Sequence, residues 1–106
     1  MNDAFKVALL PSATKVWEAL AKSDPIRYRK VGLCLYKLGQ DPRHPSLRSM
    51  RFRSLDTVHG EPIWQSYVES KTPACRVFWH YGPDKSEITV VAITPHPCAA
   101  RAQRLT

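Results

Sequence analysis

A chain of 106 residues with 43% hydrophobic residues is long enough for one modest core, so we expect a single domain over residues 1–106. Sixteen Lys and Arg residues against nine Asp and Glu give a net charge of +7, which favours a polyanionic partner: nucleic acid, an anionic membrane surface or an acidic protein. No apolar run approaches the roughly 20 residues that cross a bilayer, and the N-terminus lacks the pattern of a secretory signal, so we expect a cytoplasmic protein.

The chain carries three cysteines, Cys34, Cys75 and Cys98, and no C-x-x-C pair. An odd number of widely spaced cysteines indicates reduced thiols rather than a disulfide framework. His80 and His96 lie near two of them in the sequence, but the spacings match no familiar zinc site. The sequence therefore predicts neither a metal nor another cofactor.

The first expected element is a short strand over residues 5–10, FKVALL, which ends at Pro11. A helix follows, and Ser12 is its expected N-cap. Its apolar residues recur at the i, i+3, i+4, i+7, i+8 spacing of a helix with one buried face. They are Ala13, Val16, Trp17, Leu20 and Ala21.

A second helix has clearer boundaries, with Asp24 as N-cap, Pro25 at the first helical position and Gly39 just past the end. Its apolar stripe consists of Tyr28, Val31, Leu35 and Leu38. A tight turn joins the two helices, so we expect an antiparallel helical hairpin.

Periodicity is lost between residues 40 and 60, in the arginine-rich segment QDPRHPSLRSMRFRSLDTVHG. We interpret this segment as a long basic loop, and ordered loops of this length in small domains are more often functional than incidental. Three strands are expected after it, over residues 62–70, 75–82 and 87–94, joined by short connectors into a meander.

The order β-α-α-β-β-β predicts an α+β domain of two layers, in which a largely antiparallel four-stranded sheet carries the N-terminal helical hairpin on one face. The other face of the sheet is then open for function. Trp17, Trp64 and Trp79 are most simply explained by packing in the core or on the sheet, although an exposed one could stack on a nucleobase.

Side chains alternate along residues 75–82, so Arg76, Phe78 and His80 are expected on the sheet face away from the helices. The same alternation along the last strand puts five residues on one side, namely Ile88, Val90, Ala92, Thr94 and His96. If these two strands pair around the PDKS turn, Arg76 lies close to Thr94 and His96.

A guanidinium beside an imidazole suits cleavage of RNA by its own 2′-hydroxyl. That reaction needs a base for the 2′ proton, cations for the charge on the phosphate oxygens and an acid for the leaving 5′ oxygen. His96 offers a group that titrates near neutral pH, Arg76 offers a fixed positive charge, and the loop offers Arg48, Arg51 and Arg53. A plainer interpretation stays open, with His96 as a surface residue and the loop arginines as a solvated segment.

Four stretches, FKVALLPSATKVWEAL, DPRHPSLRSMRF, CRVFWHYG and ITVVAITPH, are spread over nearly the whole chain, from residue 5 to residue 96. Their most specific feature is the order of elements, with an arginine that opens the penultimate strand and a histidine that closes the last. In these features the chain resembles the RelE/ParE superfamily of toxins from type II toxin–antitoxin pairs. The resemblance implies a small α+β sheet with two helices packed on one side.

Within that superfamily, RelE-like members cut mRNA in the ribosomal A site, whereas ParE-like members poison DNA gyrase. The resemblance implies a ribosome-dependent mRNA endoribonuclease that inhibits translation, with a gyrase inhibitor or a degenerate RNA-binding relative as alternatives. The implied partners are an acidic cognate antitoxin and mRNA in the ribosomal A site, but no membrane. Operator DNA is a further expected ligand of the toxin–antitoxin complex, bound through the antitoxin.

By position, Arg76 resembles the family's phosphate-binding arginine and His96 resembles the basic or His residue at the end of the last strand. The resemblance therefore makes Arg76 and His96 the expected catalytic residues. The expected RNA- or ribosome-binding residues are Arg43, Arg48, Arg51, Arg53 and His80.

The chain departs from the family pattern in two places. Many RelE-like nucleases carry a tyrosine close to the C-terminus, and no tyrosine follows Tyr81 here. Gln65 and Tyr67 stand where several relatives carry Glu and Arg, so a catalytic carboxylate is missing unless Glu69 takes that part.

Overall fold

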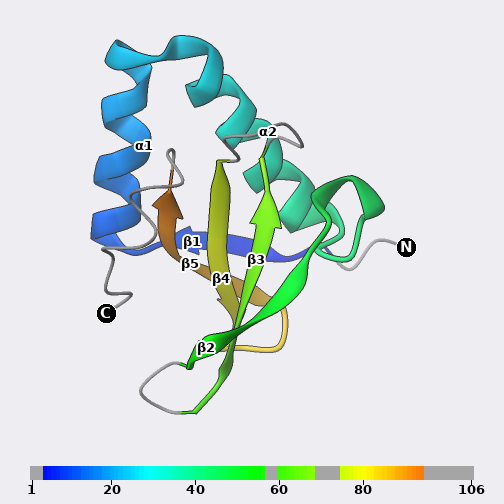
Figure 1. Ribbon diagram of the computed structural model, residues 1–106. Coiled ribbons are helices and arrows are strands. Elements are labelled where there is room, and N and C mark those ends of the chain that lie inside the picture. Colours follow the sequence, from blue (N-terminus) through cyan, green and yellow to red (C-terminus); the bar gives the residue numbers. More distant parts are fainter. Residues whose placement is uncertain (1–3, 57–59, 69–74, 95–106) are drawn as a thin grey trace.

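The computed structural model describes residues 4–56, 60–68 and 75–94, and for residues 53–56 the backbone alone. Figure 1 shows the order of elements along the chain. The helices are α1 (Pro11–Ser23), α2 (Pro25–Gln40) and a short 3₁₀ helix, η1 (Pro45–Leu47). The strands are β1 (Lys6–Leu9), β2 (Met50–Asp56), β3 (Pro62–Tyr67), β4 (Arg76–Tyr81) and β5 (Glu87–Thr94).

The strands form one sheet in the order β1-β5-β4-β3-β2. The β1–β5 pair is parallel and the other three pairs are antiparallel. Both helices cover the same face of this sheet, as Figure 1 shows. The expected α+β architecture of two layers, with a helical hairpin on one face, is therefore confirmed.

The sheet has five strands and not the expected four, because part of the arginine-rich segment forms β2. In its pairing with β3, Arg51 lies opposite Trp64 and Phe52 lies opposite Ile63. The Phe52 ring meets Phe78 on β4 edge-on, with centroids 5.0 Å apart. Met50, Arg51, Phe52 and Arg53 do alternate as in a strand, but the alternation is short, ends at Ser54 and stands in a segment dominated by arginines and prolines.

The start of α2 agrees with the sequence and the start of α1 does not. The Asp24 side chain accepts a hydrogen bond of 3.2 Å from the backbone N–H of Arg27, and Pro25 takes the first helical position. For α1, the N-cap is Leu10, which makes no side-chain capping bond, and the helix begins at Pro11, so the assignment of Ser12 as cap is wrong. Proline suits the first turn because its missing N–H would have had no partner there.

Gly39 lies inside α2, which continues to Gln40, and not past its end as expected. A Cβ atom at Gly39 would lie 3.2 Å from the Phe5 carbonyl oxygen and 3.4 Å from Cγ2 of Val7. The backbone N–H of Phe5 also donates a 2.6 Å hydrogen bond to the Gly39 carbonyl. The glycine therefore permits the close approach of α2 to the chain at β1 rather than a left-handed cap.

The main core lies between the helices and the sheet. Leu20 of α1 and Leu38 of α2 are buried there against Trp79 of β4 and Val90 of β5. Most of the expected apolar helix faces point into this core, but Ala21 is exposed. A smaller cluster on the opposite sheet face contains Ile63, Phe78, Val91 and Ala92, with Leu10 and Phe52 packed against it.

An irregularity in β5 overturns the expected alternation of its side chains. Phe78 pairs with Ala92 while its neighbour Trp79 pairs with Val90, so Val91 is an extra residue in β5. Such a bulge reverses the facing of the residues that follow it. Val90 consequently joins the helix-side core, whereas Ala92 joins the cluster on the other face.

Candidate nucleic-acid interface

Arg76 opens β4 and shares the sheet face away from the helices with Phe78, as expected. Its Nη1 atom donates a 3.1 Å hydrogen bond to Oε1 of Gln65 on β3. Its guanidinium carbon lies 5.8 Å from the centroid of the Phe78 ring. Its Nε atom is buried and has no hydrogen-bond partner. The side chain is thus half-buried and held by neutral groups.

Within residues 4–56, 60–68 and 75–94, no carboxylate balances the positive charge of Arg76. Among the described residues, its contacts are an amide oxygen and an aromatic ring, and no carboxylate forms an ion pair with it. A partly desolvated charge without a counter-ion is unfavourable, and an anionic ligand relieves that penalty. Arginine also matches the geometry of phosphate, to which it can donate two parallel hydrogen bonds.

Tyr67 connects Arg76 with a second cation. It lies directly opposite Arg76 in the β3–β4 pairing. The guanidinium carbon of Arg48 lies 5.4 Å from the centroid of the Tyr67 ring. Arg48 caps η1 in the left-handed region, with φ of 50°, where the chain turns from η1 toward β2. The Arg48 guanidinium therefore lies over the ring of the residue that pairs with Arg76 across the strands.

The last strand brings Thr94 to the same end of the sheet. Thr94 is the cross-strand partner of Arg76, and its hydroxyl donates a 3.5 Å hydrogen bond to the Arg76 carbonyl oxygen. The expected proximity of Arg76 and Thr94 is confirmed. His96 follows two residues later in the sequence and lies outside the described residues, as does the side chain of Arg53. The expected pairing of Arg76 with His96 stays a prediction.

The other expected RNA-binding residues are distributed over both sides of the sheet. Arg51 is exposed and, opposite Trp64, belongs to the helix side. Arg43 lies in the exposed turn between α2 and η1. His80 shares the face of Arg76 but is four residues further along β4, which corresponds to roughly 13 Å.

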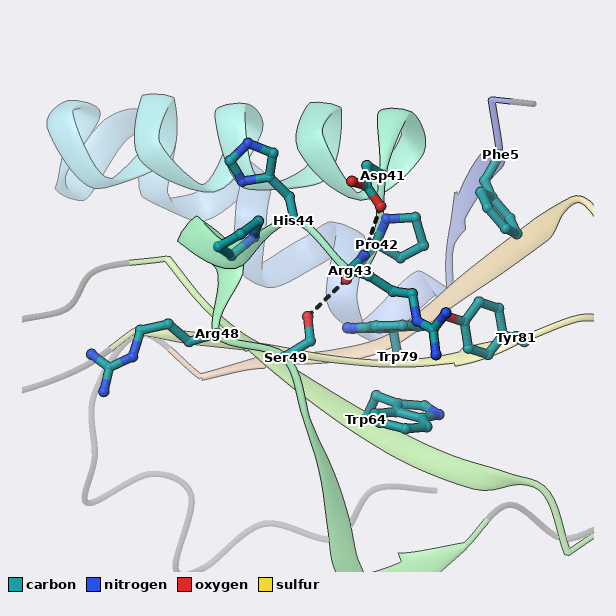
Figure 2. Close-up of a pocket in the computed structure, with 11 residues that line it drawn as sticks. Phe5, Asp41, Pro42, Arg43, His44, Arg48, Ser49, Trp64, Trp79 and Tyr81 are labelled. Carbon is teal, nitrogen blue, oxygen red and sulfur yellow. Dashed lines mark hydrogen bonds between the residues drawn. The ribbon is translucent and has the colours of Figure 1, made fainter. Parts of the chain in front are cut away.

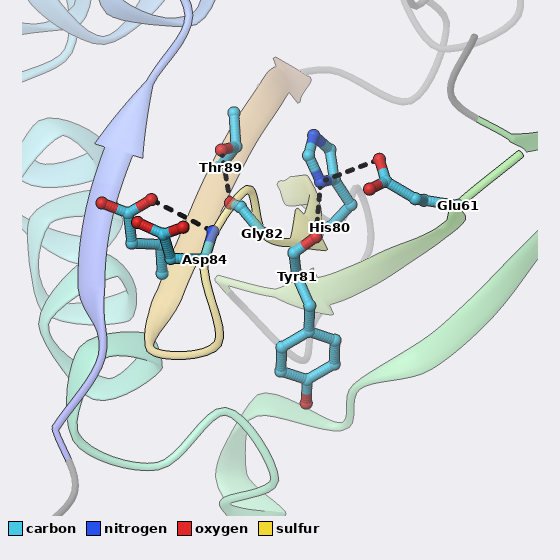
Figure 3. A network of polar contacts seen from close by, with 7 residues as sticks. Glu61, His80, Tyr81, Gly82, Asp84 and Thr89 are labelled. Atoms are coloured by element: carbon cyan, nitrogen blue, oxygen red, sulfur yellow. Dashed lines mark hydrogen bonds and ion pairs between the residues drawn. The ribbon is translucent and has the colours of Figure 1, made fainter. Parts of the chain in front are cut away.

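His80 is part of a separate polar group near the β4–β5 turn, shown in Figure 3. Its Nδ1 lies 2.9 Å from the Tyr81 carbonyl oxygen and 3.8 Å from Oε1 of Glu61. Because a carbonyl oxygen only accepts hydrogen bonds, Nδ1 carries the proton. The imidazole is therefore oriented by local contacts at the end of β4 remote from Arg76.

A pocket of about 670 Å³ lies on the helix side of the sheet, beneath the turn that follows α2 (Figure 2). Its aromatic walls are Phe5, Trp64, Trp79 and Tyr81. The turn contributes polar and charged groups at the rim, namely Asp41, Arg43, His44 and Arg48. The pocket thus joins elements from four distant parts of the sequence.

A chain of hydrogen bonds ties this turn to the sheet. The Ser49 hydroxyl donates to the Pro42 carbonyl at 3.0 Å and lies 2.7 Å from the Ser66 hydroxyl. Since Ser49 gives its proton to Pro42, Ser66 is the donor to Ser49. Ser66 in turn accepts a 2.8 Å hydrogen bond from Nε1 of Trp79. The rim of the pocket is therefore fixed to its aromatic floor.

Tyr81 is an uncharged wall of the pocket at physiological pH. Burial raises the pKa of its hydroxyl, while the Arg43 guanidinium lowers that pKa and the Asp41 carboxylate raises it. The phenol is therefore available as a hydrogen-bond donor and not as an anion.

No protein-family model and no curated protein sequence matches the chain. Solved structures do match it in fold. The YoeB/ParE toxin from Agrobacterium tumefaciens superposes with a TM-score of 0.66, over 87% of this chain and 99% of the toxin, at 12% identity. A chain of the archaeal RelE-RelB complex from Pyrococcus horikoshii OT3 gives 0.63, over 89% and 97%, at 14% identity. The YoeB dimer from Staphylococcus aureus gives 0.60, over 88% and 98%, at 11% identity.

The chain has the RelE/ParE toxin fold. This confirms the fold that the resemblance implied. None of the helices described in this RelE/ParE fold is long and apolar enough to cross a membrane.

Sequence reasoning missed two features of this RelE/ParE-fold protein. The first is the contact of Arg76 with Gln65 and the position of Tyr67 opposite it, which depend on the register of β3 against β4. The second is the pocket, whose walls meet only through tertiary structure. The only sequence signal for the pocket was that aromatic residues recur in β3 and β4, at Trp64, Trp79 and Tyr81.

Proposed function

We propose that this protein is the toxin of a type II toxin–antitoxin pair and that it cleaves mRNA in the ribosomal A site. The observation that carries the proposal is the half-buried Arg76 guanidinium, which has neutral partners and an unpaired Nε. Its fold, shared with YoeB/ParE and RelE toxins, agrees with this role. A net charge of +7 supports an RNA substrate.

The proposed reaction is attack of the RNA 2′-oxygen on the adjacent phosphorus. The new P–O2′ bond forms as the P–O5′ bond breaks, which leaves a 2′,3′-cyclic phosphate and a 5′-hydroxyl. Arg76 stabilises the negative charge on the non-bridging oxygens, and its fixed position avoids reorganisation during the reaction. His96 is proposed as the general acid or base.

Arg48 is proposed to hold a phosphate next to the one that reacts. The proposal is supported by the position of its guanidinium over the ring of Tyr67, the cross-strand partner of Arg76. Phosphate contacts of this kind set the register of the RNA and carry no sequence information. Arg43, Arg51, Arg53 and His80 are proposed as further contacts with RNA or the ribosome.

The proposed protein partner is an acidic antitoxin that covers the basic surface. One of the fold neighbours is a chain of the RelE-RelB complex from Pyrococcus horikoshii OT3, which supports a protein partner. Charge complementarity favours an acidic partner for a chain of net charge +7. Operator DNA would then be bound by the complex through the antitoxin.

The test is to induce the protein in bacteria and to map the 5′ ends of mRNA by primer extension. Arg76→Ala and His96→Ala are expected to abolish the new ends inside translated frames while folding is retained. Arg29→Ala is the matched control, because Arg29 is exposed on α2 and its loss changes the net charge equally. Unchanged cleavage with Arg76→Ala contradicts the proposal, and growth arrest with intact mRNA would favour the gyrase-inhibitor alternative.

A further inference from the structure

The pocket beneath the turn after α2 has a floor of packed aromatic rings. The rings of Trp64 and Trp79 are nearly parallel, at 21°, with centroids 6.1 Å apart. The Tyr81 ring stands edge-on to both, 5.0 Å from Trp79 and 6.4 Å from Trp64. Trp79 is only 1% exposed, whereas Tyr81 is 38% exposed and Trp64 is half-buried. A ligand in the pocket therefore meets Trp64 and Tyr81.

The rim of this pocket carries two arginines, Arg43 and Arg48, that form no ion pair with any residue the structure describes. Arg43 and Arg48 are both exposed at the rim, and among the described residues neither guanidinium donates a hydrogen bond. The one rim carboxylate, Asp41, accepts the backbone N–H of Arg43 at 3.1 Å, which ties it to the turn. Figure 2 shows the Arg43 side chain reaching over the floor beside Tyr81.

We propose that this pocket binds a nucleotide, with its base stacked on Trp64 and Tyr81 and its phosphate held by Arg43 and Arg48. A volume of about 670 Å³ accommodates a ligand of this size. Aromatic side chains stack on any nucleobase, and arginine is the preferred partner of phosphate. A simple anion would not need the aromatic floor, and an apolar ligand would not need the cationic rim.

The pocket is ready to bind without rearrangement. Hydrogen bonds run from the Pro42 carbonyl through Ser49 and Ser66 to the Trp79 indole, so the rim stays at a fixed height above the floor. A preformed site loses little conformational freedom on binding. These hydrogen bonds lie beneath the rim and leave the guanidinium groups of Arg43 and Arg48 available to a ligand.

The nucleotide is one unit of an RNA strand that continues toward Arg76, and this assignment rests on the proposed function. Arg48 makes the connection, because it lines the pocket and also lies over Tyr67, the residue opposite Arg76. A free nucleoside monophosphate has the same chemistry as a single unit of RNA. The two sources differ only in whether the ligand continues toward Arg76.

The test is a two-dimensional ¹H–¹⁵N NMR titration with adenosine 5′-monophosphate (5′-AMP). The indole signals of Trp64 and Trp79 are expected to shift, while that of Trp17 stays, because its Nε1 donates to the Tyr28 carbonyl away from the pocket. Arg43→Ala is expected to weaken binding about tenfold. Arg29→Ala, which removes the same charge from exposed α2, is expected to leave the affinity unchanged.

Trp64→Leu is expected to weaken binding of 5′-AMP by at least about tenfold, through loss of stacking. Trp64 also packs against the core, so Trp64→Leu could fail to fold. In that case the affinity of Arg43→Ala for 5′-AMP decides the test. The nucleotide site is overturned if Arg29→Ala weakens 5′-AMP binding as much as Arg43→Ala does. It is also overturned if inorganic phosphate competes for the site as well as 5′-AMP does. Binding of an acidic peptide at these signals without any response to 5′-AMP overturns it as well.

A 2′-O-methylated adenosine trinucleotide, which cannot be cleaved by its own 2′-oxygen, distinguishes the two sources. If the source is RNA, the trinucleotide binds at least about tenfold more tightly than 5′-AMP, and Arg76→Ala weakens only the trinucleotide. Equal affinities for the trinucleotide and 5′-AMP would support the nucleotide site but contradict the proposal that the bound nucleotide belongs to an RNA strand. Cleavage of mRNA without binding of either probe would overturn the nucleotide pocket but not the proposed function. Binding of both probes without cleavage of mRNA would overturn the proposed function but not the pocket.

Discussion

The Arg76 guanidinium is held from the neighbouring strand by Gln65, whose amide oxygen accepts its hydrogen bond at 3.1 Å. Gln65 is 8% exposed, so this contact is largely shielded from water. A neutral acceptor fixes the direction of the guanidinium without neutralising its charge. Glutamine at this position therefore orients Arg76 and keeps it available for an anion.

Gln65→Leu is expected to lower the free energy of unfolding by about 1–2 kcal/mol, because the Arg76 Nη1 loses its acceptor in a buried place. Urea unfolding of Gln65→Leu, Arg76→Met and the double variant measures the coupling between the two side chains. The exposed Gln40→Leu is the control and should unfold like the parent protein. Additive effects of the two single substitutions would contradict the coupling.

Gly39→Ala is expected to destabilise the protein by about 1 kcal/mol or more, despite the better helix propensity of alanine. The added Cβ would lie 3.2 Å from the Phe5 backbone oxygen, which cannot move without shifting the start of the chain beside β1. Gly32→Ala is the matched substitution in the same helix, and its Cβ would lie 3.3 Å from the edge of the Trp17 side chain.

A side chain adjusts more easily than backbone, so Gly32→Ala is expected to be neutral or stabilising. Thermal unfolding followed by circular dichroism gives both midpoints. If Gly39→Ala unfolds at the same temperature as Gly32→Ala or at a higher one, the close approach of α2 to the chain at β1 does not explain why position 39 is a glycine.

Ser66→Ala is expected to cost about 1–3 kcal/mol of stability, since the Trp79 indole N–H loses its acceptor and Ser49 loses its donor in a buried site. The same substitution should loosen the turn above the pocket and weaken 5′-AMP binding. Ser12→Ala, on the exposed side of α1, should change stability by less than about 0.5 kcal/mol. Stability equal to that of Ser12→Ala would show that the hydrogen-bond chain contributes nothing.

Stability at alkaline pH is expected to depend on Cys34. Burial, with a contribution from Cys75, raises the pKa of the Cys34 thiol from 9.0 to about 12, while Lys37 lowers it. The unfolded thiol loses its proton first, so the unfolded state binds fewer protons above pH 9.0. The contribution of Cys34 to stability is therefore complete below pH 9.0 and is lost as the pH rises toward about 12.

Urea unfolding at about pH 8 and about pH 10.5 checks this sign, because the two conditions lie on either side of the unfolded pKa. The parent protein should lose more stability between them than Cys34→Ala, which has no thiol to titrate at this position. Equal losses in the two proteins would mean that the thiol ionises alike in the folded and unfolded states.

The fold followed from the sequence where the pattern was local. The spacing of apolar residues in α2 and the cap at Asp24 were enough to predict that helix, and β5 was predicted with its observed ends. β2 was missed because the alternation of apolar residues and arginines is short, ending at Ser54 inside an arginine-rich segment. The extra residue Val91 was missed because a bulge depends on the partner strand, and no local pattern marks it.

The candidate site was predictable only in part, for the same physical reason. Arg76 and its pairing with Thr94 followed from strand alternation and a short connector. The acceptor Gln65 and the neighbour Tyr67 required the register of a second hairpin. The pocket required the turn after α2 to lie over Trp64, which tertiary packing alone determines.

The position of β2 in the sheet has a consequence for solubility. Within the described part of the chain β2 is an outermost strand, and an outermost strand offers its unpaired backbone groups to any other extended chain. Two copies that met along this edge would bring the exposed Arg51 of one copy toward the same strand of the other. Like charges in such a pairing repel, so Arg51 opposes fibrous self-association while leaving the edge attractive to a chain of opposite charge.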